Sequence, residues 1–173
     1  DEDSRARGGI LRAFQITQLF PESTVRENVR IAAQSRGQRL YPLAGRDEEH
    51  DATARELLDD IGLADRTHEQ AKFLSHGDKK KLEIAMSLAA DPELLLLDEP
   101  TSGVSGAESE WIFSFIDDVA EDVTVLLIEH DVDLVLEVSD TITVLHQGAV
   151  LARGSPDEIA GDEAVQRAYL GGY

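Results

Sequence analysis

The sequence predicts an α/β fold in which an all-helical stretch is inserted into a parallel sheet. Two short, continuous apolar runs, Leu94–Leu97 and Val123–Ile128, are typical of strands buried on both faces of such a sheet. A helical pattern over residues 108–119 separates them, which predicts a strand, helix, strand crossover. Residues 20–90 carry only helical patterns, so we expect them to form the inserted subdomain.

Three helices are expected in this inserted stretch. Thr24 and Glu27 have the spacing of a capping box, which predicts the start of the first helix. Apolar residues at helical spacing predict the second over residues 48–61 and the third over residues 78–90. Glycine and proline predict a loop over residues 36–47.

Beyond the second strand, the pattern becomes a helix, a hairpin and two short helices. The helix is expected over residues 132–138, and the hairpin strands over residues 141–145 and 150–152. Gln147-Gly148 supplies the turn between these strands. The short helices are expected within residues 155–170.

Composition restricts the function classes. No window approaches the run of about 20 apolar residues that a membrane-spanning helix needs, and no export leader is visible, so we expect a cytoplasmic location. The absence of cysteine excludes disulfides and thiolate metal sites. A net charge of -19 argues against nucleic-acid binding. Dispersed acidity of this kind fits a salt-rich cytoplasm and an ordinary acidic protein equally well.

The apolar run at Leu94–Leu97 ends in two carboxylates, Asp98 and Glu99. They fall at the carboxyl edge of the predicted parallel sheet, where open α/β folds bind ligands. Asp98 is a candidate ligand of Mg²⁺, and Glu99 is a candidate for polarising the water that attacks a γ-phosphate. By itself, the same pattern also suits a buried strand followed by an acidic helix cap.

A second candidate site opens the helix that precedes this strand. Gly77 would let a phosphate approach the backbone, while Ser75 and the free N–H groups of the helix start would offer donors to an anion. Alone, this segment is more typical of a plain helix cap. Followed by Leu82–Ala85 and then by Asp98 and Glu99, it resembles the signature and Walker B motifs of ABC ATPases.

Flanking motifs extend the resemblance over nearly the whole chain. Phe14-Gln15 looks like the Q-loop of the family, and Ile128–Asp131 looks like its H-loop. Gly154–Pro156 and Ala168–Gly171 point to the ATP-binding subunits of branched-chain amino acid importers and, next, of urea importers. The resemblance implies a P-loop NTPase-like (RecA-like) fold with a partial parallel sheet and an inserted helical subdomain.

On this resemblance, the chain divides into three parts. Residues 1–19 hold the Q-loop and the end of a truncated N-terminal part. Residues 20–92 form the helical subdomain with the signature motif. Residues 93–173 form the α/β core with the Walker B motif, D-loop, H-loop and C-terminal helices.

The resemblance also implies cofactors, partners and residue roles. Two subunits would sandwich two ATP molecules with Mg²⁺ at the cytoplasmic face of the membrane, as peripheral partners of transmembrane permease subunits that choose the substrate. Ser75 and Gly77 would contact the ATP of the partner subunit. The residues implied for the subunit's own nucleotide are Glu99, His130 and Gln15 as catalytic residues, and Asp98 and Gln15 as metal ligands.

One motif of the family is absent from these 173 residues. No G-x-x-x-x-G-K followed by Ser or Thr occurs, and Gly8-Gly9 lacks the lysine that would hold nucleotide phosphates. We therefore expect an N-terminally truncated domain that is inactive alone. A catalytically dead regulatory or binding subunit is the alternative, while the acidity disfavours a soluble ABC protein working on DNA or ribosomes.

Smaller departures fall in the signature motif and the D-loop. His76 and Asp78 stand where the family more often has a small residue or glycine and then a glutamine. Asp78 would put a carboxylate near the partner's triphosphate, but the same charge also suits a helix N-terminus, and we expect Asp78 to act as the helix cap. Ser105 stands where the D-loop usually has Asp or Asn, which puts communication between the two sites of a dimer in question.

Overall fold

The computed structural model describes residues 10–13, 19–34 and 46–170. The chain forms two compact units, Asp1–Ile128 and Glu129–Tyr173. Gln15 and the predicted loop over residues 36–47, except its last two residues, lie outside the described residues.

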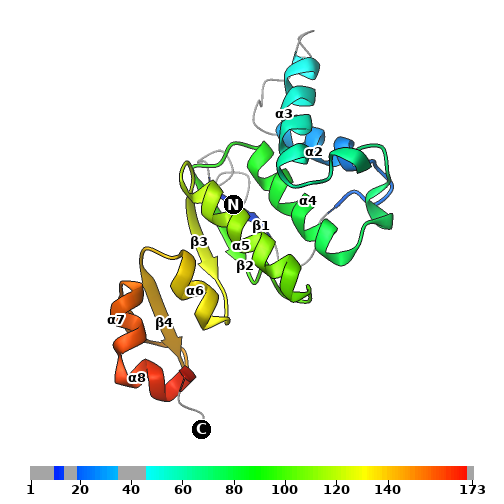
Figure 1. Ribbon diagram of the computed structural model, residues 1–173. Helices are drawn as coiled ribbons and strands as arrows, with labels where there is room; N and C mark the ends of the chain where they lie inside the picture. The colour runs from blue at the N-terminus through cyan, green and yellow to red at the C-terminus, as the bar shows by residue number, and fades with distance from the viewer. Residues whose placement is uncertain (1–9, 14–18, 35–45, 171–173) are drawn as a thin grey trace. The chain divides into compact units, whose positions relative to one another are not determined.

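The first unit contains a parallel sheet of three strands (Figure 1). Its strands are β1 (Ile10–Ala13), β2 (Leu94–Asp98) and β3 (Thr124–Ile128), in that spatial order. The helix α5 (Gly106–Ala120) connects β2 to β3. The predicted strand, helix, strand crossover is therefore confirmed.

A helical stretch separates β1 from β2 in the sequence, although the two strands are neighbours in the sheet. Its helices are α2 (Val25–Gln34), α3 (Arg46–Asp60) and α4 (His76–Ala89), and two short 3-10 turns, Ala64–Arg66 and Ala71–Phe73, lie between α3 and α4. The chain thus leaves the sheet, folds the predicted helical layer and returns to the adjacent strand; the pairing of β1 with β2 was not predicted.

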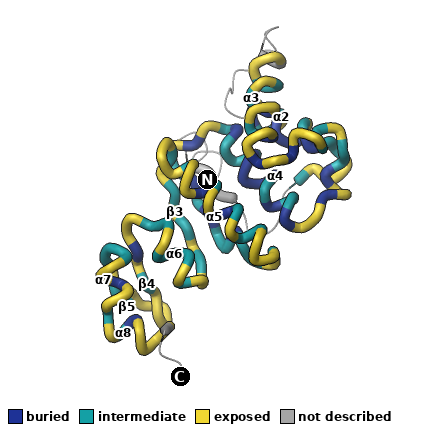
Figure 2. The backbone as a smooth tube through the Cα atoms, in the orientation of Figure 1, coloured by how far each residue is buried: buried dark blue, intermediate teal, exposed yellow. Residues whose placement is uncertain are grey.

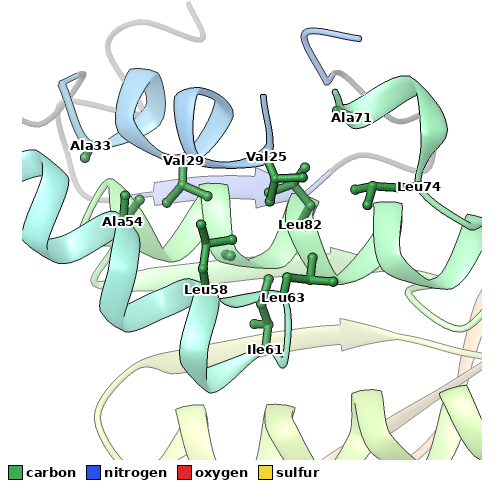
Figure 3. Packing of buried hydrophobic residues seen from close by; sticks show 12 residues of the cluster. Val25, Val29, Ala33, Ala54, Leu58, Ile61, Leu63, Ala71, Leu74 and Leu82 are labelled. Atoms are coloured by element: carbon green, nitrogen blue, oxygen red, sulfur yellow. The ribbon is translucent and has the colours of Figure 1, made fainter. Parts of the chain in front are cut away.

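Helix α4 joins two hydrophobic cores of this unit. Figure 3 shows Val25 and Val29 of α2 packed with Leu58 of α3 and Leu82 of α4 in the first core. Ile84, on another face of α4, belongs to the second core, which α4 shares with β2 and α5. Because successive residues of a helix point in different directions, one helix can serve both cores.

Strand β3 corrects one expectation. Val123–Ile128 was predicted to be buried on both faces, but Leu126 and Ile128 are 55% and 56% exposed. In Figure 2, the tube of β3 carries only the colours of intermediate and exposed residues. Val125 and Leu127, which point to the other face, pack in the core that α5 shares with the sheet. Within the described residues, only one face of β3 is covered, so a continuous apolar run here does not mean two buried faces.

The second unit is a hairpin with helices packed on it. Helix α6 (Val132–Val138) precedes the antiparallel strands β4 (Ile142–His146) and β5 (Ala149–Gly154), and α7 (Pro156–Gly161) and α8 (Glu163–Val165) follow. Gln147 and Gly148 both have positive φ, 49° and 79°, as a tight hairpin turn requires. The predicted hairpin is confirmed. None of the helices described in either unit is long and apolar enough to cross a membrane.

Candidate functional site

Asp98 and Glu99 lie at the carboxyl edge of the parallel sheet. Asp98 is the last residue of β2 and is paired in register with Ile128 of β3. Glu99 has a φ of 48°, a left-handed conformation that costs a residue with a side chain about 1–2 kcal/mol. Its backbone N–H donates to the carbonyl of Ile128 at 2.8 Å, which anchors this turn to the neighbouring strand. Such backbone strain clusters at functional sites.

Ser75 is the N-cap of α4. Its hydroxyl oxygen accepts a hydrogen bond from the backbone N–H of Asp78 at 3.0 Å and donates one to Asp78 Oδ2 at 2.8 Å. Asp78 itself stands in the first helical turn, where the helix dipole favours a carboxylate. The expectation that Asp78 caps this helix is wrong, because the N-cap is Ser75 and Asp78 lies in the first turn.

Gly77 packs closely against the start of α5. A Cβ added to Gly77 would overlap with Oε1 of Glu108. The other carboxylate oxygen of Glu108 accepts hydrogen bonds from the backbone N–H of Ser105 at 2.9 Å and from its hydroxyl at 2.7 Å, and these bonds lower the pKa of Glu108. His76 Nε2 lies 3.4 Å from the carbonyl oxygen of Ser102. The predicted signature segment therefore contacts the predicted D-loop segment within one chain.

This contact makes Gly77→Ala a stability test. The added methyl group would displace the Glu108 carboxylate from its bonds to Ser105, and we expect a melting temperature about 2–4 °C below that of Gly106→Ala, in which the gain from replacing a helical glycine by alanine is not offset in this way. Gly106→Ala is the matched control, since nothing lies within 4 Å of a Cβ at that helical position. In a Glu108→Ala background the Gly77→Ala effect should shrink. Equal melting temperatures for Gly77→Ala and Gly106→Ala would contradict this explanation.

The other two expected site residues, His130 and Gln15, lie outside the described part of the first unit. His130 belongs to the second unit, where it directly precedes α6; its side chain is 74% exposed, and its Nδ1 lies 3.5 Å from Glu129 Oε2. Gln15 falls outside the described residues. The first unit thus places two pairs, Asp98 with Glu99 at the end of β2 and Ser75 with Gly77 at the start of α4.

Asn28 is a structural residue whose role the sequence analysis missed. It is fully buried on α2, and its Oδ1 accepts from the backbone N–H of Phe20 at 2.7 Å. Its Nδ2 donates to the carbonyls of Phe20 at 3.0 Å and Thr24 at 2.9 Å. A polar residue beside Val29, on the apolar side of a predicted helix, was the available signal.

Arg66 is a second residue that the sequence analysis missed. From the turn Ala64–Arg66 its guanidinium donates to Asp78 Oδ2 at 2.6 Å and to both carboxylate oxygens of Glu69 at 2.7 and 2.9 Å. The bonds to Glu69 are the main cause that raises the pKa of Arg66, and Arg66 in turn lowers the pKa of Glu69. The signature helix is therefore tied to the turn that precedes it by an ion-pair network.

These motifs occur in a sequence that matches a known family. Residues 1–102 match the family model described as ABC transporter. The chain belongs to this family of ATP-binding proteins. A second model, described as branched-chain amino acid ATP-binding cassette transporter, matches residues 149–173 of this ABC protein. The predicted family is confirmed, and by family the chain is an ABC-type ATPase.

Similar relatives agree with both models. The high-affinity branched-chain amino acid transport ATP-binding protein LivG of Salmonella typhimurium (strain LT2) is 39% identical over 176 residues, which cover 96% of this ABC chain and 69% of LivG. BraF of Pseudomonas aeruginosa, a protein of the same description, is 38% identical over 177 residues, with the same coverage. The crystal structure of the ADP conformation of MJ1267, an ATP-binding cassette of an ABC transporter, matches with a TM-score of 0.80 and 29% identity, over 98% of this chain and 71% of that chain. The predicted P-loop NTPase-like fold is thereby confirmed.

Proposed function

We propose that this chain is the ATP-binding subunit of an ABC importer for branched-chain amino acids, and that it acts at the cytoplasmic face of the membrane with permease subunits. The observation that carries ATP hydrolysis is the pair Asp98 and Glu99 at the carboxyl edge of the sheet, with Glu99 held in a left-handed conformation. The substrate class is supported by the similarity to LivG and BraF and by the match over residues 149–173.

Each site residue receives a role in this proposal. Asp98 fits a ligand of Mg²⁺, because Mg²⁺ is usually bound by one or two carboxylates together with phosphate oxygens and water, and Asp98 is half-buried at the sheet edge. ATP supplies the phosphoryl group that is transferred to water. Glu99 orients that water and accepts its proton. The remaining assignments are Gln15 and His130 to the subunit's own nucleotide, and Ser75 and Gly77 to the nucleotide of a partner subunit.

We further infer that the 173 residues do not turn over ATP by themselves. Without the P-loop amides and lysine, the β- and γ-phosphates lack most of the donors that position them and stabilise their charge. The alternative, a catalytically dead regulatory or binding subunit, makes the same prediction for this chain. The division into residues 1–19, 20–92 and 93–173 stays a prediction that limited proteolysis can test.

A fusion protein separates the two possibilities. The P-loop-extended chain is defined as residues 1–173 with a P-loop-containing segment of another ABC ATP-binding subunit joined to residue 1. We expect no Mg²⁺-dependent phosphate release above background from the 173 residues, and steady release from the P-loop-extended chain. Release from the 173 residues that Glu99→Gln abolishes would show that the inactivity prediction is wrong. An inactive but folded extended chain, able to bind ATP, would favour the dead subunit.

A further inference from the structure

The signature segment of this chain carries a carboxylate close to a proposed phosphate contact. Asp78 Oδ2 is 2.8 Å from the hydroxyl oxygen of Ser75, which the proposed function assigns to the partner subunit's ATP. A carboxylate at this place acts against an incoming triphosphate in two ways. Its negative charge repels the phosphate, and it competes for the hydroxyl proton that Ser75 would donate to a phosphate oxygen.

Arg66 counters both effects. Its Nη1 donates to Asp78 Oδ2 at 2.6 Å, so the oxygen that receives the Ser75 hydroxyl also receives a guanidinium proton. A carboxylate oxygen engaged in this way carries less available negative charge and is a weaker acceptor for the hydroxyl. Arg66 and Asp78 are both partly sheltered, with side chains 34% and 22% exposed, so solvent screens the pair only in part.

The position of Arg66 is fixed from its other side. Its Nε and Nη2 form a two-pronged pair with Glu69, which leaves Nη1 directed at Asp78. The backbone of this segment is bonded to the start of α2, where Val25 N–H donates to the carbonyl of Glu69 at 2.9 Å and Arg26 N–H donates to that of Thr67 at 3.1 Å. The guanidinium is therefore presented from an anchored turn.

We propose that Arg66 is a positioning residue for the signature motif: it neutralises Asp78 so that Ser75 can receive the partner subunit's ATP. This inference rests on the proposed function, in which the signature contacts ATP across a dimer interface. It explains why this chain can use an aspartate at a position where the family more often has an uncharged glutamine. If the ion pair between Arg66 and Asp78 were merely structural, it would stabilise the start of the helix. The charge of Asp78 would then have no effect on dimerisation driven by ATP.

The test measures the ATP concentration that gives half-maximal dimerisation of the P-loop-extended chain in a Glu99→Gln background. We expect Arg66→Gln to raise this concentration by about tenfold at low salt, because it leaves Asp78 uncompensated beside the phosphate, and by less at high salt. Adding Asp78→Asn to Arg66→Gln should restore the parental value to within about threefold, since it removes the repelling charge. Arg66→Lys keeps the charge but cannot form the two-pronged pair with Glu69 that directs Arg66 at Asp78, so its half-maximal concentration should lie between those of the parent and Arg66→Gln.

Matched variants separate this role from a merely structural one. Glu69 also pairs with Arg66 but has no contact with Ser75 among the described bonds, so adding Glu69→Gln to Arg66→Gln should not restore dimerisation. The ATP affinity of the monomer and the melting temperature are measured for every variant. Neither quantity should change in parallel with the ATP concentration that gives half-maximal dimerisation.

One possible result would contradict the proposed function, and another would contradict only the role of Arg66. If the parental Glu99→Gln protein binds ATP but does not dimerise, the two-subunit arrangement in the proposed function is wrong, and the inference fails with it. If the parent dimerises and Arg66→Gln matches it, or if Asp78→Asn does not rescue Arg66→Gln, the role of Arg66 is wrong while the proposed function stands.

Discussion

Replacing Glu99 by glutamine in the P-loop-extended chain is expected to lower ATP turnover by about 10²–10⁴-fold and to leave ATP affinity almost unchanged. Glutamine has nearly the same shape as glutamate, so it can occupy the same left-handed turn after β2. It cannot accept a proton from the attacking water. Asp98, which we assign to the metal, is untouched, so nucleotide binding should persist. The loss therefore falls on the chemical step.

Phosphate release and calorimetric ATP binding measure the two quantities separately. Glu93→Gln is the matched control, because Glu93 is an exposed carboxylate at the opposite end of the same strand and has no role in the proposed site. Its turnover should equal that of the parent. If the Glu99→Gln protein hydrolysed ATP at the parental rate, Glu99 would not be catalytic. If its ATP affinity fell by as much as its turnover, Glu99 would be a binding residue instead.

Asn28→Ala is expected to reduce the free energy of unfolding by about 3 kcal/mol. The substitution removes three hydrogen bonds from a fully buried side chain and leaves the backbone N–H of Phe20 without its partner, while the carbonyl of Phe20 keeps only its bond from the Ser23 N–H. These bonds hold the segment Phe20–Thr24 against α2.

Urea unfolding of the P-loop-extended chain measures this effect. Gln34→Ala, at the exposed end of the same helix, is the control and should change the unfolding free energy by less than about 0.5 kcal/mol. Asn28→Asp keeps the acceptor for Phe20 N–H but loses both donors, so it should also destabilise. If Asn28→Ala were as stable as Gln34→Ala, the buried amide would not be what holds Phe20–Thr24.

The elements of the fold were largely predictable because their signals are local. Helix α6 occupies the predicted residues 132–138, and the hairpin turns at Gln147-Gly148, where both residues must adopt positive φ. Boundaries shifted where a cap decides them: α4 begins at His76, two residues before the predicted start, because Ser75 is the residue that caps it. The motif residues Asp98 and Glu99 were recognisable because they follow an apolar strand directly.

By itself, the sequence determined the family, the alternation of helices and strands, and the candidate residues, since each of these is carried by neighbouring residues or by motifs in a given order. Only the tertiary structure decided which distant atoms meet. It brought Glu108 against Gly77, the guanidinium of Arg66 onto Asp78, and the amide of Asn28 onto the backbone of Phe20. It also left one face of β3 uncovered within the described residues. The spacing of apolar residues shows which side chains share one face of a helix or strand. What that face contacts depends on how segments that are distant in the sequence pack together.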